Sequence, residues 1–141
     1  MKNKWLVLIS VALAFFLVSF DGGIIGILLP TIQTYFSAEF YQVQWITLAG
    51  FLTIVVTLAI FGRLGDSIGK KTVFVCGSIV YPLGTVLLVL ARSVTMVAVF
   101  RIVQGLGLSI FLALGTAIVT EAFEDKKRGL ALGVYNLLGL L

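Results

Sequence analysis

The chain has 141 residues, of which 60% are hydrophobic and 11% charged, and its 10 Lys and Arg against 6 Asp and Glu give a net charge of +4. An average soluble domain is about half apolar and a quarter charged, so this chain has too few polar residues to cover a globular core. Its basic residues form short clusters between apolar runs, which excludes a continuous nucleic-acid-binding surface and favours a protein embedded in a lipid bilayer.

Four apolar runs are long enough to cross a bilayer, because a helix rises about 1.5 Å per residue and the hydrocarbon core is about 30 Å thick. These spans are predicted at residues 5–29, 43–61, 72–91 and 95–119. A fifth run, 129–141, corresponds to about 20 Å of helix, so we expect it to enter the membrane without completing a crossing. The predicted fold is an all-α bundle of transmembrane helices, four complete and the fifth truncated, with residues 1–141 forming one incomplete amino-terminal transmembrane domain.

The first run admits two interpretations. Lys2 and Lys4 precede it, and Ala12-Leu13-Ala14 resembles the cleavage site of a signal peptide. The apolar stretch before that site is too short for a signal peptide, and apolar sequence continues beyond it, so we interpret the run as a span. The segment Pro30–Gln42 is then expected to form the first external loop.

The distribution of basic residues predicts the orientation, because Lys and Arg in short loops remain in the cytoplasm. The amino terminus and the connections after the second and fourth runs are basic, whereas the other two connections hold only Arg92. We therefore expect a multi-pass protein of the cell membrane with a cytoplasmic amino terminus. The residues that decide this orientation are Lys2, Lys4, Arg63, Lys70, Lys71, Lys126, Lys127 and Arg128.

Two charged residues, Asp21 and Arg101, lie well inside predicted spans, where each costs at least about 2.5 kcal/mol to insert. Asp21 lies about 24 Å from the inner end of the first helix, and Arg101 about 9 Å from the outer end of the fourth. Both depths fall in the outer third of the membrane, so we predict that the two charges pair directly or through water across a polar cavity. The functional hypothesis is that Asp21 exchanges a proton during transport and Arg101 responds to its charge; the alternative is a purely structural ion pair.

Gln104, three residues after Arg101, is the other large polar side chain inside a span, and its amide is expected to hydrogen-bond toward the cavity or between helices. Small residues around these polar side chains predict close helix packing. Gly22 and Gly26 are expected to thin the first helix where it meets the fourth. On the fourth helix, the small residues at one-turn intervals after Arg101 are Gly105, Ser109, Ala113 and Ala117.

Side chains that enzymes and metal sites use are scarce. The chain holds no histidine and a single cysteine, Cys76, which excludes histidine acid–base catalysis, histidine-containing zinc sites and an intrachain disulfide. With Asp21 as the one intramembrane carboxylate, neither a carboxylate pair nor a metal site can be built within the spans. We therefore expect no enzyme activity, no catalytic residue, no metal and no cofactor.

The connection after the second run is predicted to be a short cytoplasmic link with one carboxylate among three cations, and it reads Gly62-Arg63-Leu64-Gly65-Asp66-Ser67-Ile68-Gly69-Lys70-Lys71. It resembles the signature turn of the major facilitator superfamily. Residues 101–107 resemble that superfamily's fourth-helix motif, residues 21–32 resemble the first-helix motif of drug:proton antiporters, and Gln44-Trp45 resembles the start of the second helix in the fourteen-span branch.

This resemblance implies a transporter of two six-helix halves that alternates between inward and outward openings, with this chain supplying most of one half. Asp21 then takes the protonatable position and Arg101 that of the arginine linked to proton coupling. Asp66 takes the position that caps a helix of the opposite half and locks the outward-open state, helped by Lys70 and Glu121. The residues expected to form this conformational gate are Gly62, Asp66, Gly69, Lys70, Lys71 and Glu121.

The resemblance also bears on the substrate. Gly50 stands where the fourteen-span branch often has a tyrosine, and Gly23 and Gly26 where it often has Thr and Asn. These departures make the predicted cavity more apolar, which suits lipophilic compounds.

The function predicted from the sequence is proton-coupled secondary transport, as multidrug efflux of lipophilic compounds. The expected partners are the lipid bilayer, a small-molecule substrate, protons and the remaining helices of the transporter, and nucleic acid is not among them. The alternative is a non-transporting, truncated membrane protein or small subunit that packs against a partner chain through its glycine faces.

Overall fold

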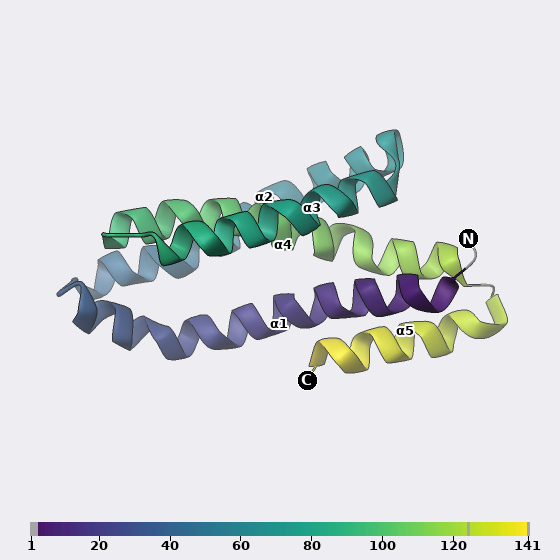
Figure 1. Ribbon diagram of the computed structural model, residues 1–141, viewed down its shortest axis with the longest axis horizontal. Coiled ribbons are helices and arrows are strands. Elements are labelled where there is room, and N and C mark those ends of the chain that lie inside the picture. The colour runs from purple at the N-terminus through teal and green to yellow at the C-terminus, as the bar shows by residue number, and fades with distance from the viewer. Residues whose placement is uncertain (1–2, 124, 141) are drawn as a thin grey trace.

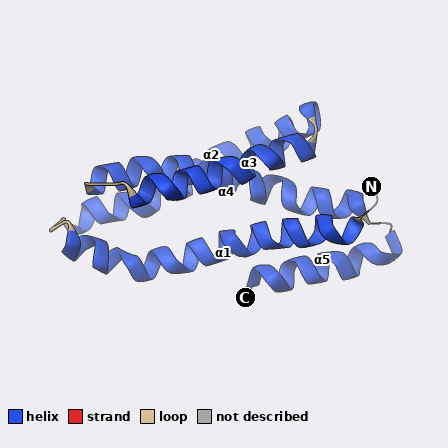
Figure 2. Ribbon diagram, in the orientation of Figure 1, coloured by secondary structure: helices blue, strands red, loops and turns tan. Residues whose placement is uncertain are grey.

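A computed structural model describes residues 3–123 and 125–140, and Lys2 and Leu141, which entered the predictions above, lie outside this part of the chain. All regular structure in the described residues is helical (Figure 2). The five helices are α1 (Lys4–Tyr35), α2 (Phe40–Ile68), α3 (Lys70–Val89), α4 (Val94–Ala122) and α5 (Asp125–Leu140). Helices α1 to α4 are long and apolar enough to cross a membrane, which confirms the predicted all-α transmembrane fold.

Helices α1, α2 and α4 extend beyond the predicted spans at both ends, whereas α3 begins and ends two residues before its predicted bounds. The first external loop is shorter than expected. Helix α1 does not end at Leu29 but continues through Pro30 to Tyr35, so that the loop predicted over Pro30–Gln42 is reduced to residues 36–39. The hydroxyl of Thr34 donates to the carbonyl oxygens of Pro30, at 3.1 Å, and Thr31, at 2.9 Å. Hydropathy therefore marks where the apolar stretch stops, whereas the helix continues for as long as its backbone groups find partners.

The predicted link Gly62–Lys71 is also mostly helical, which corrects the sequence-based prediction. Helix α2 runs on to Ile68 and α3 begins at Lys70, so Gly69 alone forms the turn. Gly69 has a φ of 103°, a conformation that only glycine adopts without strain, and its N–H donates to the carbonyl oxygen of Gly65 at 3.1 Å. The signature stretch thus belongs to two helix ends joined by one residue.

Helix α4 is the centre of the bundle. Of its most apolar 18-residue stretch, 56% is buried, against 28% in α1 and 17% in both α2 and α3. Helices α2 and α3 pack on α4, while α1 packs on α4 and α5. In Figure 1, α1 and α5 lie side by side, and α4 crosses the α2–α3 pair and lies between this pair and α1 toward the right of the view.

The connections alternate between the two ends of the bundle (Figure 1). The start of α1, the α2–α3 turn, the end of α4 and the start of α5 lie at one end, on the right of the view, and the α1–α2 and α3–α4 connections lie at the opposite end. The first end, which carries Lys70, Lys71 and Lys126 to Arg128, is called the basic end below.

Apolar clusters hold α1 at both ends. At the basic end, buried Leu8 and Val11 of α1 pack with Val119 of α4 and Tyr135 of α5. At the opposite end, Ile25, Leu29 and Ile32 of α1 pack around the cluster of Val43, Ile46 and Val97. Asp21 lies between these two clusters, so its position opposite α4 is fixed from both sides.

Candidate functional site

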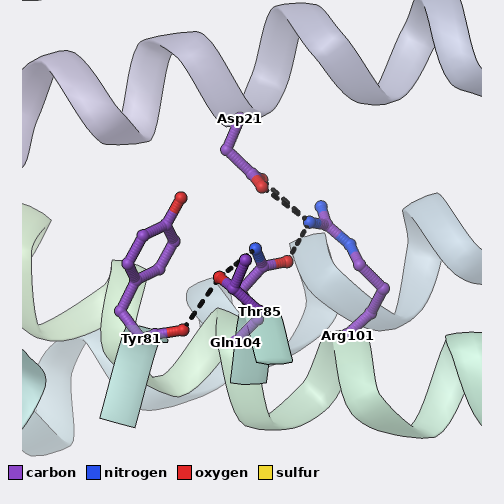
Figure 3. A network of polar contacts seen from close by, with 5 residues as sticks. All are labelled: Asp21, Tyr81, Thr85, Arg101 and Gln104. Atoms are coloured by element: carbon purple, nitrogen blue, oxygen red, sulfur yellow. Dashed lines mark hydrogen bonds and ion pairs between the residues drawn. The ribbon is translucent and has the colours of Figure 1, made fainter. Parts of the chain in front are cut away.

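A buried ion pair joins α1 to α4. Nη1 of Arg101 donates to Oδ1 of Asp21 at 3.0 Å and to Oδ2 at 2.9 Å. The side chains are 6% and 8% exposed, respectively, so bulk water does not screen them. Figure 3 shows Asp21 pointing from α1 toward the Arg101 guanidinium. The structure thus brings together the two intramembrane charges that the sequence placed at similar depth.

The ion pair continues into a chain of hydrogen bonds that reaches α3 (Figure 3). Nη1 of Arg101 also donates to Oε1 of Gln104, and Nε2 of Gln104 donates to the hydroxyl of Thr85 at 3.1 Å. The Thr85 hydroxyl in turn donates to the backbone carbonyl of Tyr81 at 3.0 Å. Four polar side chains from three helices are therefore linked inside an apolar bundle, and we call Asp21, Arg101, Gln104 and Thr85 the polar chain.

Glycines bring α4 close enough to its neighbours for this chain to form. A Cβ atom added at Gly84 of α3 would lie 2.6 Å from the backbone of Gln104, and one at Gly107 would lie 2.7 Å from the backbone of Tyr81. The α3 and α4 backbones are therefore in direct contact at two points. A glycine on each helix at the contact allows such an approach in a membrane, where van der Waals packing drives helix association.

Gly50 of α2 makes room for the guanidinium on its other side. A Cβ atom at this position would lie 3.0 Å from Nη2 and 3.3 Å from Nε of Arg101. Nε is buried and has no hydrogen-bond partner among the described residues. A larger residue at position 50 would occupy the space that Arg101 uses, which gives a physical reason for the glycine at this position.

A cavity of about 390 Å³ lies beside the polar chain, between α1, α3 and α4. All four members of the polar chain contribute to its wall, together with Tyr81, whose ring points toward α1 (Figure 3). The rest of the wall is apolar and comprises Phe20, Ile24, Ile25, Leu28, Ile32, Phe36, Leu88, Val89, Ala91 and Val97. Its volume lies within the range of small-molecule sites, and a few polar groups in an apolar wall are typical of such sites.

A second charged cluster lies at the basic end. Nζ of Lys70 lies 3.3 Å from Oδ1 of Asp66 and also bonds Oε1 of Glu121. The carboxylate side chains are 71% and 63% exposed, so water and salt screen both pairs and their contribution to stability is small. Lys70 thus links the α2–α3 turn to the end of α4. Gly62 and Lys71 take no part in these two ion pairs, and Gly69 forms the turn itself.

The predicted packing residues fall into two groups. On α4, a Cβ at Gly105 would lie 3.1 Å from the carbonyl oxygen of Gly50, and Ser109 is fully buried and hydrogen-bonded to Thr57 of α2 at 2.8 Å. Ala113 packs against the cluster of Val73, Ile110 and Leu114. Gly105 and Ser109 of the small-residue stripe therefore face α2.

The expectation that Gly22 and Gly26 face α4 is wrong. A Cβ atom at either residue would meet no other atom within 4 Å among the described residues. Successive residues turn by about 100° around a helix, so these glycines lie about 100° and 140° away from Asp21, which occupies the side that faces α4. They leave that part of the α1 surface open.

Sequence reasoning missed Thr85 and Tyr81 as members of the site. Both lie in α3, separated by four residues, and therefore on one face of that helix. The signal available in the sequence was a tyrosine and a threonine four residues apart in an apolar run. That Thr85 lies next to Gln104 depends on the close contact between Gly84 and Gln104, which the sequence does not reveal. Within the described residues, no group of three or more His, Cys, Asp or Glu side chains could hold a metal ion.

Known proteins similar to this chain are membrane transporters. The family model described as Major Facilitator Superfamily matches residues 11–141. The chain is 34% identical over 134 residues to the riboflavin transporter RibZ of Clostridioides difficile, an alignment that covers 95% of this chain and 29% of the relative.

Two further relatives are named for export or drug transport. The tetracenomycin C resistance and export protein of Streptomyces glaucescens is 30% identical over 134 residues, covering 95% of this chain and 25% of the relative. The multidrug transporter protein MdtP of Bacillus subtilis is 28% identical over 137 residues, covering 97% and 25%. The chain therefore spans less than a third of the length of each of these curated relatives.

Proposed function

The chain belongs to the Major Facilitator Superfamily, and on this premise we propose that it forms part of a proton-coupled secondary transporter that exports lipophilic small molecules. Members of this superfamily are transporters rather than enzymes. The observation that carries the proposal is the buried pair of Asp21 and Arg101 at the wall of an apolar cavity. A charged pair at this depth is costly to insert and has a functional role by default.

Proton coupling follows from the chemistry of the pair. Arginine remains charged under all physiological conditions, whereas a carboxyl group can accept a proton. Protonation of Asp21 would leave Arg101 with an uncompensated charge in an apolar surrounding, and deprotonation would restore the pair. Uptake and release of a proton therefore change the electrostatic free energy of the α1–α4 contact, which is the property needed to couple protons to a conformational change.

The cavity supports a small organic substrate. Its wall is mostly aliphatic and aromatic, and the polar chain supplies hydrogen-bonding groups on one side. The three relatives named above are described as transporters of riboflavin, of tetracenomycin C and of multiple drugs. These descriptions are consistent with a small-molecule substrate, and the apolar wall favours a lipophilic one.

The basic end suggests both the orientation and the gate. Lys and Arg gather at the end that holds the amino terminus, so we place that end in the cytoplasm of a multi-pass cell-membrane protein. There Asp66, Lys70 and Glu121 connect α2, α3 and α4 through exposed ion pairs. Because such pairs are weak, they can open during a transport cycle, and we propose that they form a cytoplasmic gate with the rest of the transporter.

The test is transport of a lipophilic fluorescent dye by the full-length protein in everted membrane vesicles under an imposed pH gradient. Asp21→Asn should abolish gradient-driven transport while the amount of inserted protein stays the same, because asparagine keeps an acceptor for Arg101 but cannot bind the proton. Glu39→Gln, which alters an exposed carboxylate at the start of α2, is the matched control and should behave as the parent protein. Unchanged gradient-driven transport in Asp21→Asn would remove Asp21 from the coupling mechanism.

A further inference from the structure

The amide of Gln104 has one orientation that satisfies both of its neighbours. A guanidinium group only donates hydrogen bonds, so the Gln104 atom that faces Nη1 of Arg101 must be the oxygen. The amide nitrogen then points to Thr85 Oγ1, 3.1 Å away. Because the Thr85 hydroxyl gives its hydrogen to the Tyr81 carbonyl, at 3.0 Å, its oxygen is left to accept from Gln104. The direction of each of these hydrogen bonds is thus set by the Arg101 guanidinium at one end of the polar chain and by the Tyr81 carbonyl at the other.

The position of Thr85 relative to Gln104 is fixed by the backbone. The neighbouring Gly84 contacts the backbone of Gln104, and Gly107 of α4 contacts the backbone of Tyr81. These two close contacts, at Tyr81 and Gly84 in the turn before Thr85, prevent α3 from sliding along α4. The Thr85 hydroxyl therefore stays within hydrogen-bond distance of the Gln104 amide without itself bonding Asp21 or Arg101.

We propose that Thr85 is a positioning residue for the proton-coupled step, an inference that rests on the proposed function. Among the described residues, Asp21 and Gln104 supply the acceptors of Arg101 Nη1. When Asp21 takes up a proton, it loses its charge and its attraction for the guanidinium falls, whereas the Gln104 oxygen accepts from Nη1 as before. By holding that oxygen toward α1, Thr85 keeps Arg101 in place until Asp21 releases the proton.

Loss of the Thr85 hydroxyl would leave the Gln104 NH₂ group without this acceptor in an apolar surrounding. The side chain must then change its conformation to reach another acceptor, which takes its oxygen away from the guanidinium, and Arg101 moves from its present position. Because a nearby positive charge governs the proton affinity of a carboxyl group, this movement changes the pH at which Asp21 is protonated. A purely structural hydrogen bond would have no such effect.

The experiment compares Thr85→Val, which is isosteric and lacks the hydroxyl, with Thr85→Ser, which keeps it, in the full-length protein in membrane vesicles. Two quantities are followed against pH: gradient-driven dye transport, and modification of Asp21 by a carbodiimide, which reacts with protonated carboxyl groups and is quantified by mass spectrometry of the Asp21 peptide. Thr85→Val should shift the midpoints of both curves by at least about half a pH unit. Thr85→Ser should leave both near those of the parent protein.

Thr57→Val is the matched control, because it removes another hydrogen bond between helices, that of Thr57 to Ser109 at 2.8 Å, away from the polar chain. It should leave both midpoints unchanged. If valine crowds Gln104 and impairs insertion, Thr85→Ala repeats the test, because alanine also lacks the hydroxyl and is smaller than threonine.

The outcomes separate this inference from the proposed function. Lower transport in Thr85→Val and Thr85→Ala with unchanged midpoints in both curves would overturn the positioning role. A shifted carbodiimide curve in a protein whose transport ignores the pH gradient would support the positioning of Gln104 and Arg101 by Thr85 and overturn proton-coupled transport.

Discussion

At the scale of single residues, the two members of the buried pair are not equivalent. Asp21 and Arg101 are both almost fully buried, and each is the other's counter-charge. A carboxyl group left alone can bind a proton and become neutral, whereas arginine cannot lose its charge. Removing the aspartate should therefore be more harmful to the fold than removing the arginine.

Asp21→Ala is expected to lower the free energy of unfolding by about 3–5 kcal/mol, because it leaves an unpaired guanidinium in the bundle. Arg101→Met should cost less, and its cost should shrink as the pH is lowered and Asp21 is protonated. Stability of the purified protein can be measured by denaturant titration in detergent micelles at a series of pH values. Equal losses for the two variants at all pH values would contradict this asymmetry.

At the scale of helices, the contact between α3 and α4 depends on backbone atoms. The Cβ of an alanine at position 84 would lie 2.6 Å from the backbone nitrogen and Cα of Gln104. Neither helix can yield there by rotating a side chain, so the two helices must separate. In contrast, a Cβ at Gly62 of α2 would meet nothing within 4 Å among the described residues.

Gly84→Ala should therefore destabilise the bundle by about 1–3 kcal/mol, the usual cost of overpacking, and weaken the bond between Thr85 and Gln104. Gly62→Ala is the matched substitution within a helix and should leave stability unchanged or raise it by up to about 1 kcal/mol, since alanine favours helix more than glycine does. The same denaturant titration measures both variants. A Gly84→Ala protein as stable as the parent would show that α3 and α4 are not in tight contact.

At the scale of the whole molecule, the alternating connections and the basic end predict one orientation in the membrane. With Cys76 replaced by serine, a single cysteine can be introduced as Arg92→Cys, between α3 and α4, or as Lys127→Cys, in α5. A membrane-impermeant maleimide applied to intact cells should label the first and label the second only after permeabilisation. The opposite labelling pattern would reverse the orientation and place the gate residues outside.

The sequence by itself determined the class of the protein. Apolar runs of the right length predict four membrane helices, because a helix that crosses a bilayer requires an uninterrupted apolar stretch. Such a stretch is visible in the sequence without knowledge of the tertiary structure. The same reasoning placed Asp21 and Arg101 at similar depth, and the structure pairs them. The ends of the helices were predicted less well, because α1 passes Pro30 and α2 passes Gly62 on backbone hydrogen bonds that hydropathy does not report.

Only the tertiary structure decided which faces meet. In an apolar solvent, hydrophobicity does not distinguish a surface that faces lipid from one that faces another helix. The sequence therefore could not separate Gly22 and Gly26, which meet nothing within 4 Å among the described residues, from Gly84 and Gly107, which bring two backbones together. Those backbone contacts place Thr85 against Gln104, and a residue without a charge or a motif thereby joins the polar chain.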